Sequence, residues 1–69
     1  MVEVFKTNVK KKQHARMLID QIGKTFCNYT ANFDLEDCDK ILRVEGVDFS
    51  VDLIIEKVRI LGYRCEVLE

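Results

Sequence analysis

Lysine, histidine and cysteine are the side chains in this sequence whose types and spacing could do chemistry. Three consecutive lysines, residues 10–12, stand two positions before the single histidine, His14. Ammonium groups attract carboxylates and phosphates, whereas imidazole and thiolate groups bind metal ions. The three cysteines, Cys27, Cys38 and Cys65, include no Cys-x-x-Cys pair, which indicates neither a disulfide framework nor a standard zinc motif. We therefore expect reduced thiols.

The size and charge of the chain narrow the classes of function. Its 69 residues, 48% hydrophobic and 33% charged with no proline, predict one folded domain, residues 1–69. A net charge of −1 argues against general nucleic-acid binding, which usually needs a basic footprint. No apolar stretch approaches the roughly 18 residues of a membrane span, and the first residues lack the order of a signal peptide. We expect no membrane association and a cytoplasmic location.

The elements that must position these side chains follow from hydrophobic spacing. Residues 2–9 alternate, with Val2 and Val4 in one phase, as expected of a half-buried strand. From His14 the spacing changes to three and four residues, which predicts an amphipathic helix of about twelve residues. The apolar positions of this helix are Ala15, Leu18, Ile19, Ile22 and Phe26.

The second half of the chain repeats the pattern of strands and a helix. Residues 28–35 and 40–46 predict two antiparallel strands joined by the acidic segment 36–39, with Leu42 and Val44 on the inner face. Ser50 is a good N-cap for a second helix, which ends at Gly62. A last strand begins near Tyr63. The inward positions of the second helix and last strand are Val51, Ile54, Ile55, Val58, Leu61, Tyr63, Cys65 and Val67.

The resulting order, βαββαβ, predicts an α+β, ferredoxin-like fold. Right-handed crossovers give a four-stranded antiparallel sheet of strand order 4-1-3-2 with two helices on one face. In this topology residues 9–14, 35–39 and 62–64 lie at the same end of the sheet. Cys27 then lies at the opposite end.

The sequence resembles the heavy-metal-associated (HMA) domain family, which includes small copper chaperones and the N-terminal modules of metal-transporting ATPases. The resemblance covers nearly the whole chain and rests on "VFKTNV", "DKILRVEG" and "IIEKVRILGYRCE", together with the spacing of the first helix. Family members carry a hydrophobic-x-Cys-x-x-Cys motif before that helix. Leu18 and Ile22 align this motif with Val9 at the hydrophobic position, Lys11 at the first cysteine and His14 at the second.

Both metal-binding cysteines of the family motif are therefore replaced. A lysine ammonium has no lone pair to donate near neutral pH, and it places a positive charge where a cation would sit. The resemblance thus implies an HMA-like, metallochaperone-like scaffold with a degenerate metal-binding motif, no cofactor and no enzymatic activity. We expect a non-catalytic protein-interaction module of a bacterial cytoplasm. Its partner would be an acidic protein domain, such as a related metal-transport domain.

The surface expected to bind this partner is the basic turn, with Tyr63 beside it. Its residues are Lys10, Lys11, Lys12, His14, Arg16 and Tyr63, and Lys6 extends the same basic face. Charged side chains at a helix start cost little, so the lysine run is equally compatible with a solvated turn. An anion site at the helix N-terminus is another reading, in which phosphate or sulfate raises the melting temperature.

Two further alternatives involve other residues. A non-standard Cu(I) or Zn(II) site could use His14, Cys38 and Cys65, with Asp37 or Asp39 as an oxygen ligand. The chain would then be a protein of heavy-metal binding, transport or sensing. A homodimer could form through the second or fourth strand, because both lie at a sheet edge.

Overall fold

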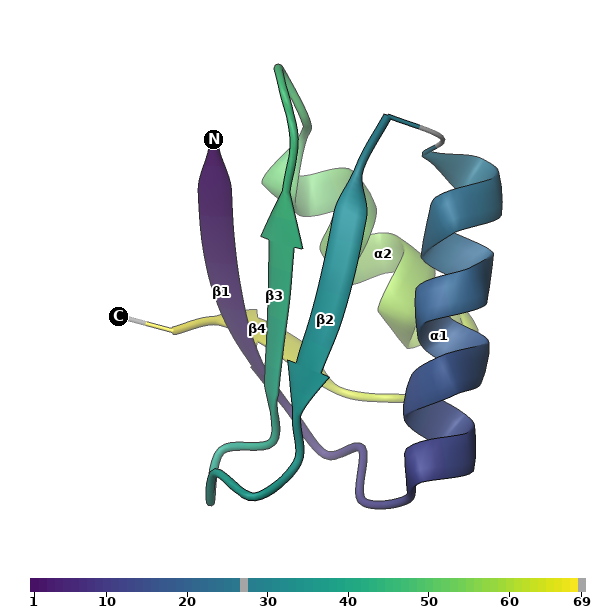
Figure 1. Cartoon of the computed structure of the whole chain (residues 1–69), viewed down its shortest axis with the longest axis vertical. Helices are drawn as coiled ribbons and strands as arrows, with labels where there is room; N and C mark the ends of the chain where they lie inside the picture. Colours follow the sequence, from purple (N-terminus) through teal and green to yellow (C-terminus); the bar gives the residue numbers. More distant parts are fainter. Residues whose placement is uncertain (27, 69) are drawn as a thin grey trace.

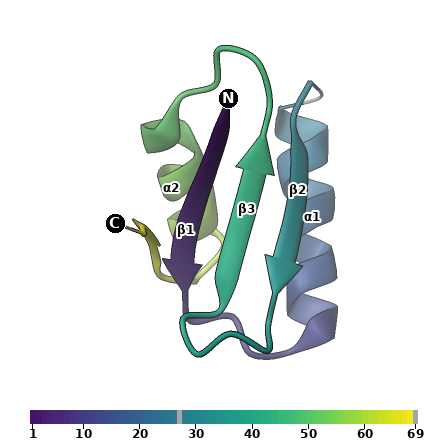
Figure 2. The same ribbon diagram turned by 60° about the vertical axis from the view of Figure 1, so that its left-hand side comes forward.

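The fold is one antiparallel sheet covered on one face by two helices. The computed structural model describes residues 1–26 and 28–68. The elements of these residues are β1 (Val2–Thr7), α1 (Lys12–Thr25), β2 (Thr30–Asp34), β3 (Ile41–Glu45), α2 (Val51–Ile60) and β4 (Cys65–Val67). The sheet has the order β2-β3-β1-β4, and both helices lie on the same side of it (Figures 1 and 2). This confirms the predicted ferredoxin-like architecture, since 4-1-3-2 is the same sheet read from the other edge.

The core lies between the sheet and the helices. One group of buried side chains joins the sheet to α2 and to Ile22 of α1, with Leu42 and Val44 on the inner face as predicted. A smaller group lies under the start of α1 and contains Val9, Ala15 and Leu18. The main group consists of Phe5, Ile22, Leu42, Val44, Phe49, Ile54, Val58 and Cys65.

The inward face of β1 differs from the sequence prediction. Val2 and Val4 do share a face, but it is the outer one, and Val2 is 47% exposed. Phe5 is fully buried instead, and it pairs in register with Leu42 on β3 and Val67 on β4. A phenyl ring buries more apolar surface than a valine, and a strand can turn only alternate residues inward. The largest apolar side chain therefore decides which face enters the core.

Local sequence signals predicted both ends of α2 but not the start of α1. The Ser50 hydroxyl oxygen accepts a hydrogen bond from the Leu53 N–H at 3.4 Å, and Gly62 adopts a φ of 100° after α2, so both predicted ends are confirmed. α1 begins at Lys12, two residues before the predicted start. Within the described residues, neither helix combines the length and the apolar character needed to cross a membrane.

Candidate functional site

The turn after β1, the β2–β3 connection and the α2–β4 connection meet at one end of the sheet (Figure 1). The Thr7 N–H donates to the Asp39 carbonyl at 3.0 Å, and the Thr7 hydroxyl donates to the Lys40 carbonyl at 2.6 Å. The Arg64 N–H donates to the side-chain oxygen of Asn8 at 2.8 Å. These bonds confirm the prediction that three distant segments are neighbours, and they hold the turn between two fixed connections.

Val9 anchors the turn from the inside. Its side chain is fully buried in the group that contains Ala15 and Leu18, and Tyr63 and Leu61 pack against the same group. Burying a valine contributes on the order of 1.5–3 kcal/mol, so the turn has a strong preference for this orientation. The three residues that follow, 10–12, are all exposed.

The start of α1 is uncapped and positively charged. Lys11 is the N-cap residue, its side chain makes no capping hydrogen bond, and the first turn contains no acidic residue. The first N–H groups of a helix lack intrahelical partners and carry partial positive charge. In the described part of the chain, the ion pairs do not include residues 10–12. They are Lys6–Glu66 at 3.6 Å and Lys24–Asp20 at 3.1 Å.

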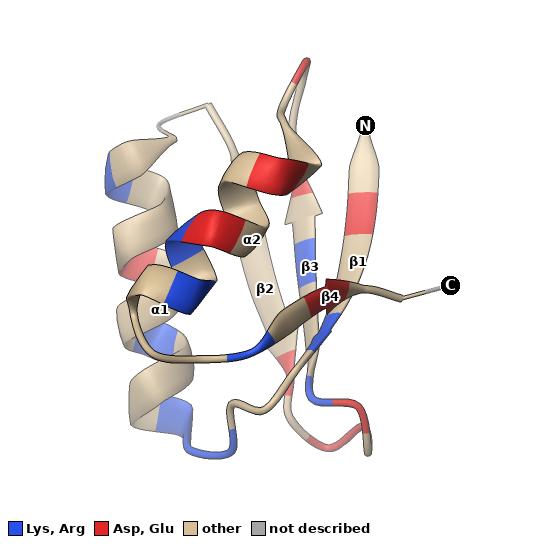
Figure 3. Cartoon of the chain, turned by 180° about the vertical axis from the view of Figure 1, so that it is seen from behind, with Lys and Arg blue, Asp and Glu red and all other residues tan. Residues whose placement is uncertain are grey.

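His14 and Tyr63 extend this positive region along the helix and across to the α2–β4 connection. Their ring centroids are 5.8 Å apart with a tilt of 53°, and both side chains are half-buried. Arg16 is exposed on the next part of α1. Figure 3 shows the basic residues around the turn and the first part of α1. We call this region the basic turn surface. It comprises Lys10, Lys11, Lys12, His14, Arg16 and Tyr63.

The β2–β3 connection carries the opposite charge at the same end of the molecule (Figure 3). Side-chain ligand atoms of Asp37, Cys38 and Asp39 lie within 4.8 Å of one another. The Asp37 side-chain oxygen accepts the Asp39 N–H at 2.8 Å, which fixes the turn locally. The ammonium of Lys40 donates to the Leu35 carbonyl at 2.9 Å, so the one lysine of this segment points back into it.

The cysteines occupy different environments. Cys65 is 1% exposed, and its burial raises the pKa of the thiol from 9.0 to about 12; Arg59 opposes this rise and Glu66 adds to it. Cys38 is exposed, and Cys27 lies outside the described residues. Of the predicted ligands, the structure brings Cys38 together with Asp37 and Asp39, but this set includes neither His14 nor Cys65.

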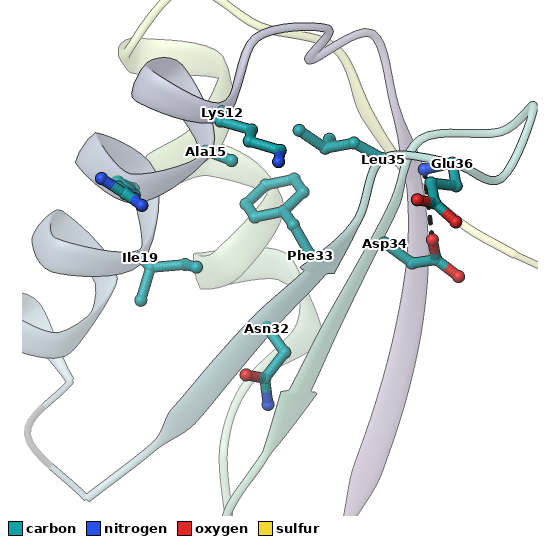
Figure 4. Close-up of a pocket in the computed structure, with 9 residues that line it drawn as sticks. Lys12, Ala15, Ile19, Asn32, Phe33, Asp34, Leu35 and Glu36 are labelled. Carbon is teal, nitrogen blue, oxygen red and sulfur yellow. Dashed lines mark hydrogen bonds between the residues drawn. The ribbon is translucent and has the colours of Figure 1, made fainter.

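A groove of about 400 Å³ runs beside the basic turn surface, between α1 and the edge strand β2 (Figure 4). Its apolar wall includes Ala15, Ile19, Phe33 and Leu35, and Lys12 lies at its rim. The sequence places Ile19 on the apolar face of the helix and does not predict a groove. The edge position of the second strand in the predicted sheet is the signal that could have found it, because inward side chains of an edge strand have a neighbouring strand on one side only.

Comparison of the chain with protein-family models, with curated proteins and with solved structures finds no match. The resemblance to the HMA family therefore stays a prediction from the sequence motifs.

Proposed function

We propose that the chain is an HMA-like domain without the two-cysteine metal motif, and that it works as a non-catalytic protein-interaction module. The observation that carries the proposal is the basic turn surface. Its lysines are held outward by the buried Val9, stand at an uncapped helix start and have no ion-pair partner among the described residues. Such a surface favours an acidic partner domain, for instance a related metal-transport domain.

The environment of the motif positions supports this role over standard metal capture. Lys11, at the position of the first cysteine, is exposed and carries a cationic head group, and His14, at the second, is half-buried against Tyr63. Among the described residues no polar or charged side chain is buried, whereas catalytic acids and bases usually occupy desolvated positions. These observations favour a binding surface.

The test is capture of a partner by the immobilised chain, followed by binding of the purified partner at rising ionic strength. The Debye length falls from about 10 Å at 0.1 M salt to about 3 Å at 1 M, so salt weakens binding that depends on the lysine charges. The double variant Lys10→Glu/Lys11→Glu should therefore weaken binding and remove most of its salt dependence. Lys24→Glu and Arg43→Glu are controls that reverse charges at the far end of α1 and on the outer face of the sheet. Unchanged binding by the double variant would refute the proposed surface.

A second candidate function is metal binding at the β2–β3 connection. The observation that favours it is the closeness of the Asp37, Cys38 and Asp39 ligand atoms, a donor set of one thiol and two carboxylates that zinc accepts. Titration of the fully reduced chain with Zn(II) and Cu(I) against a competing chelator tests it. Competitor-resistant binding that is lost in Cys38→Ser and kept in His14→Ala would support a metal function at this connection. Binding that both variants retain in full would exclude a site built on these side chains.

A further inference from the structure

The groove between α1 and β2 combines an open sheet edge with an apolar wall. Among the described residues, β2 pairs with β3 alone, so on its other side alternate backbone N–H and C=O groups have no strand partner. The Phe33 and Leu35 side chains point toward α1 (Figure 4). Ile19 points from the helix toward Phe33 across the groove (Figure 4). An extended chain laid along β2 would thus find backbone partners and an apolar surface together.

The charges at the groove are divided between its two sides. Lys12 and Arg16 line it from α1, and in the described residues neither belongs to an ion pair. Asp34 and Glu36 lie on the strand side, where their carboxylates are turned away from α1 (Figure 4), and Asp34 accepts the Glu36 N–H at 3.2 Å. The charged groups nearest the apolar wall are therefore cationic. A carboxylate on the bound chain would complement them.

We propose that this groove binds an extended acidic segment of a partner protein, which pairs with β2 as a fifth strand of the sheet. One apolar side chain of the segment packs between Ile19 and Phe33, and an acidic side chain faces Lys12 and Arg16. This inference rests on the proposed interaction function and specifies the form of the partner. Lys12 and Arg16 belong to the basic turn surface, so the two sites are continuous.

A second copy of the chain fits the groove less well. If β2 of another molecule paired with this edge, its side chains directed toward α1 would be Ala31, Phe33 and Leu35 by strand alternation. Its carboxylates, Asp34 and Glu36, would lie on the opposite face. Lys12 and Arg16 would then gain no acidic partner from the paired strand, so charge complementarity favours a different protein.

The probe for this groove is a blocked heptapeptide in which aspartate, valine and isoleucine alternate with threonine. Titration into the isotope-labelled chain should shift amide resonances of residues 30–36 and of the groove side of α1, and should slow amide exchange at alternate residues of β2. The variant Lys12→Glu/Arg16→Glu should weaken binding about tenfold, because two exposed attractions to the acidic side chain are replaced by repulsions. Arg43→Glu, on the outer face, should bind as the unmodified chain does.

The titration separates failure of the groove from failure of the basic turn surface. Shifts confined to residues 10–14 and 63, with β2 unaffected, would overturn the groove and leave the proposed function in place. Tight binding of a control peptide with lysine in place of aspartate, or equal binding by Lys12→Glu/Arg16→Glu, would also overturn it. Concentration-dependent dimerisation of the chain alone that protects the β2 edge would assign the groove to a second copy instead.

Discussion

Burial of the Cys65 thiol makes the stability of this protein depend on pH in the alkaline range. The pKa of Cys65 rises from 9.0 to about 12 in the folded state. Above pH 9 the thiol of the unfolded chain loses its proton while the buried thiol keeps it, so the unfolded state is increasingly favoured. The stabilising contribution is therefore fully present below 9 and is lost progressively as the pH approaches 12. Each pH unit within this interval lowers the free energy of unfolding by about 1.4 kcal/mol.

Urea unfolding under reducing conditions at about pH 8 and about pH 10 measures this contribution. The thiol should account for a loss of about 1.4 kcal/mol of unfolding free energy between the two conditions. Cys65→Ala removes that part of the loss, although it also lowers stability at both pH values by leaving a small cavity. All other ionisable groups are common to both proteins, so their contributions cancel in the difference.

The exposed cysteine supplies the matched control. Cys38→Ala keeps Cys65 and should retain the pH dependence of the unmodified chain. If the unmodified chain and Cys65→Ala lose stability in parallel, the Cys65 thiol ionises as easily in the folded state as in the unfolded one. That result would refute the burial of the Cys65 thiol. Cys65 would then again be a candidate metal ligand together with Cys38.

Three substitutions test local features that stabilise the fold, each by urea unfolding. Gly46→Ala places a Cβ 2.6 Å from the Tyr29 ring and should lower the free energy of unfolding by about 1–3 kcal/mol. This loss should be smaller in a Tyr29→Ala background, and equal losses in the two backgrounds would contradict the clash. Gly62→Ala meets no atom within 4 Å but forces alanine to a φ of 100°, so a loss of about 1–2 kcal/mol is expected, and none if the turn can rearrange. Ser50→Ala removes the α2 cap and should cost about 0.5–1 kcal/mol, whereas Ser50→Gly should cost less.

Local signals were sufficient for much of the fold. Ser50 and Gly62 fixed the ends of α2 because a cap and a left-handed residue act within one helical turn. Leu42 and Val44 identified the inner face of β3 because strand alternation leaves one consistent choice. The order of elements then restricted the topology, which in turn placed the basic turn beside Tyr63.

By itself, then, the sequence determined the order of strands and helices, the sheet order and the position of the lysine run. Only the tertiary structure decided which face of β1 enters the core. Phe5 is buried, whereas Val2 and Val4 lie on the outer face. The tertiary structure also decided that Ile19 and Phe33 border a groove and that Cys65 is separated from the cluster at Cys38. The physical reason is that periodicity assigns a side chain to a face. Whether that face is covered depends on the elements packed against it.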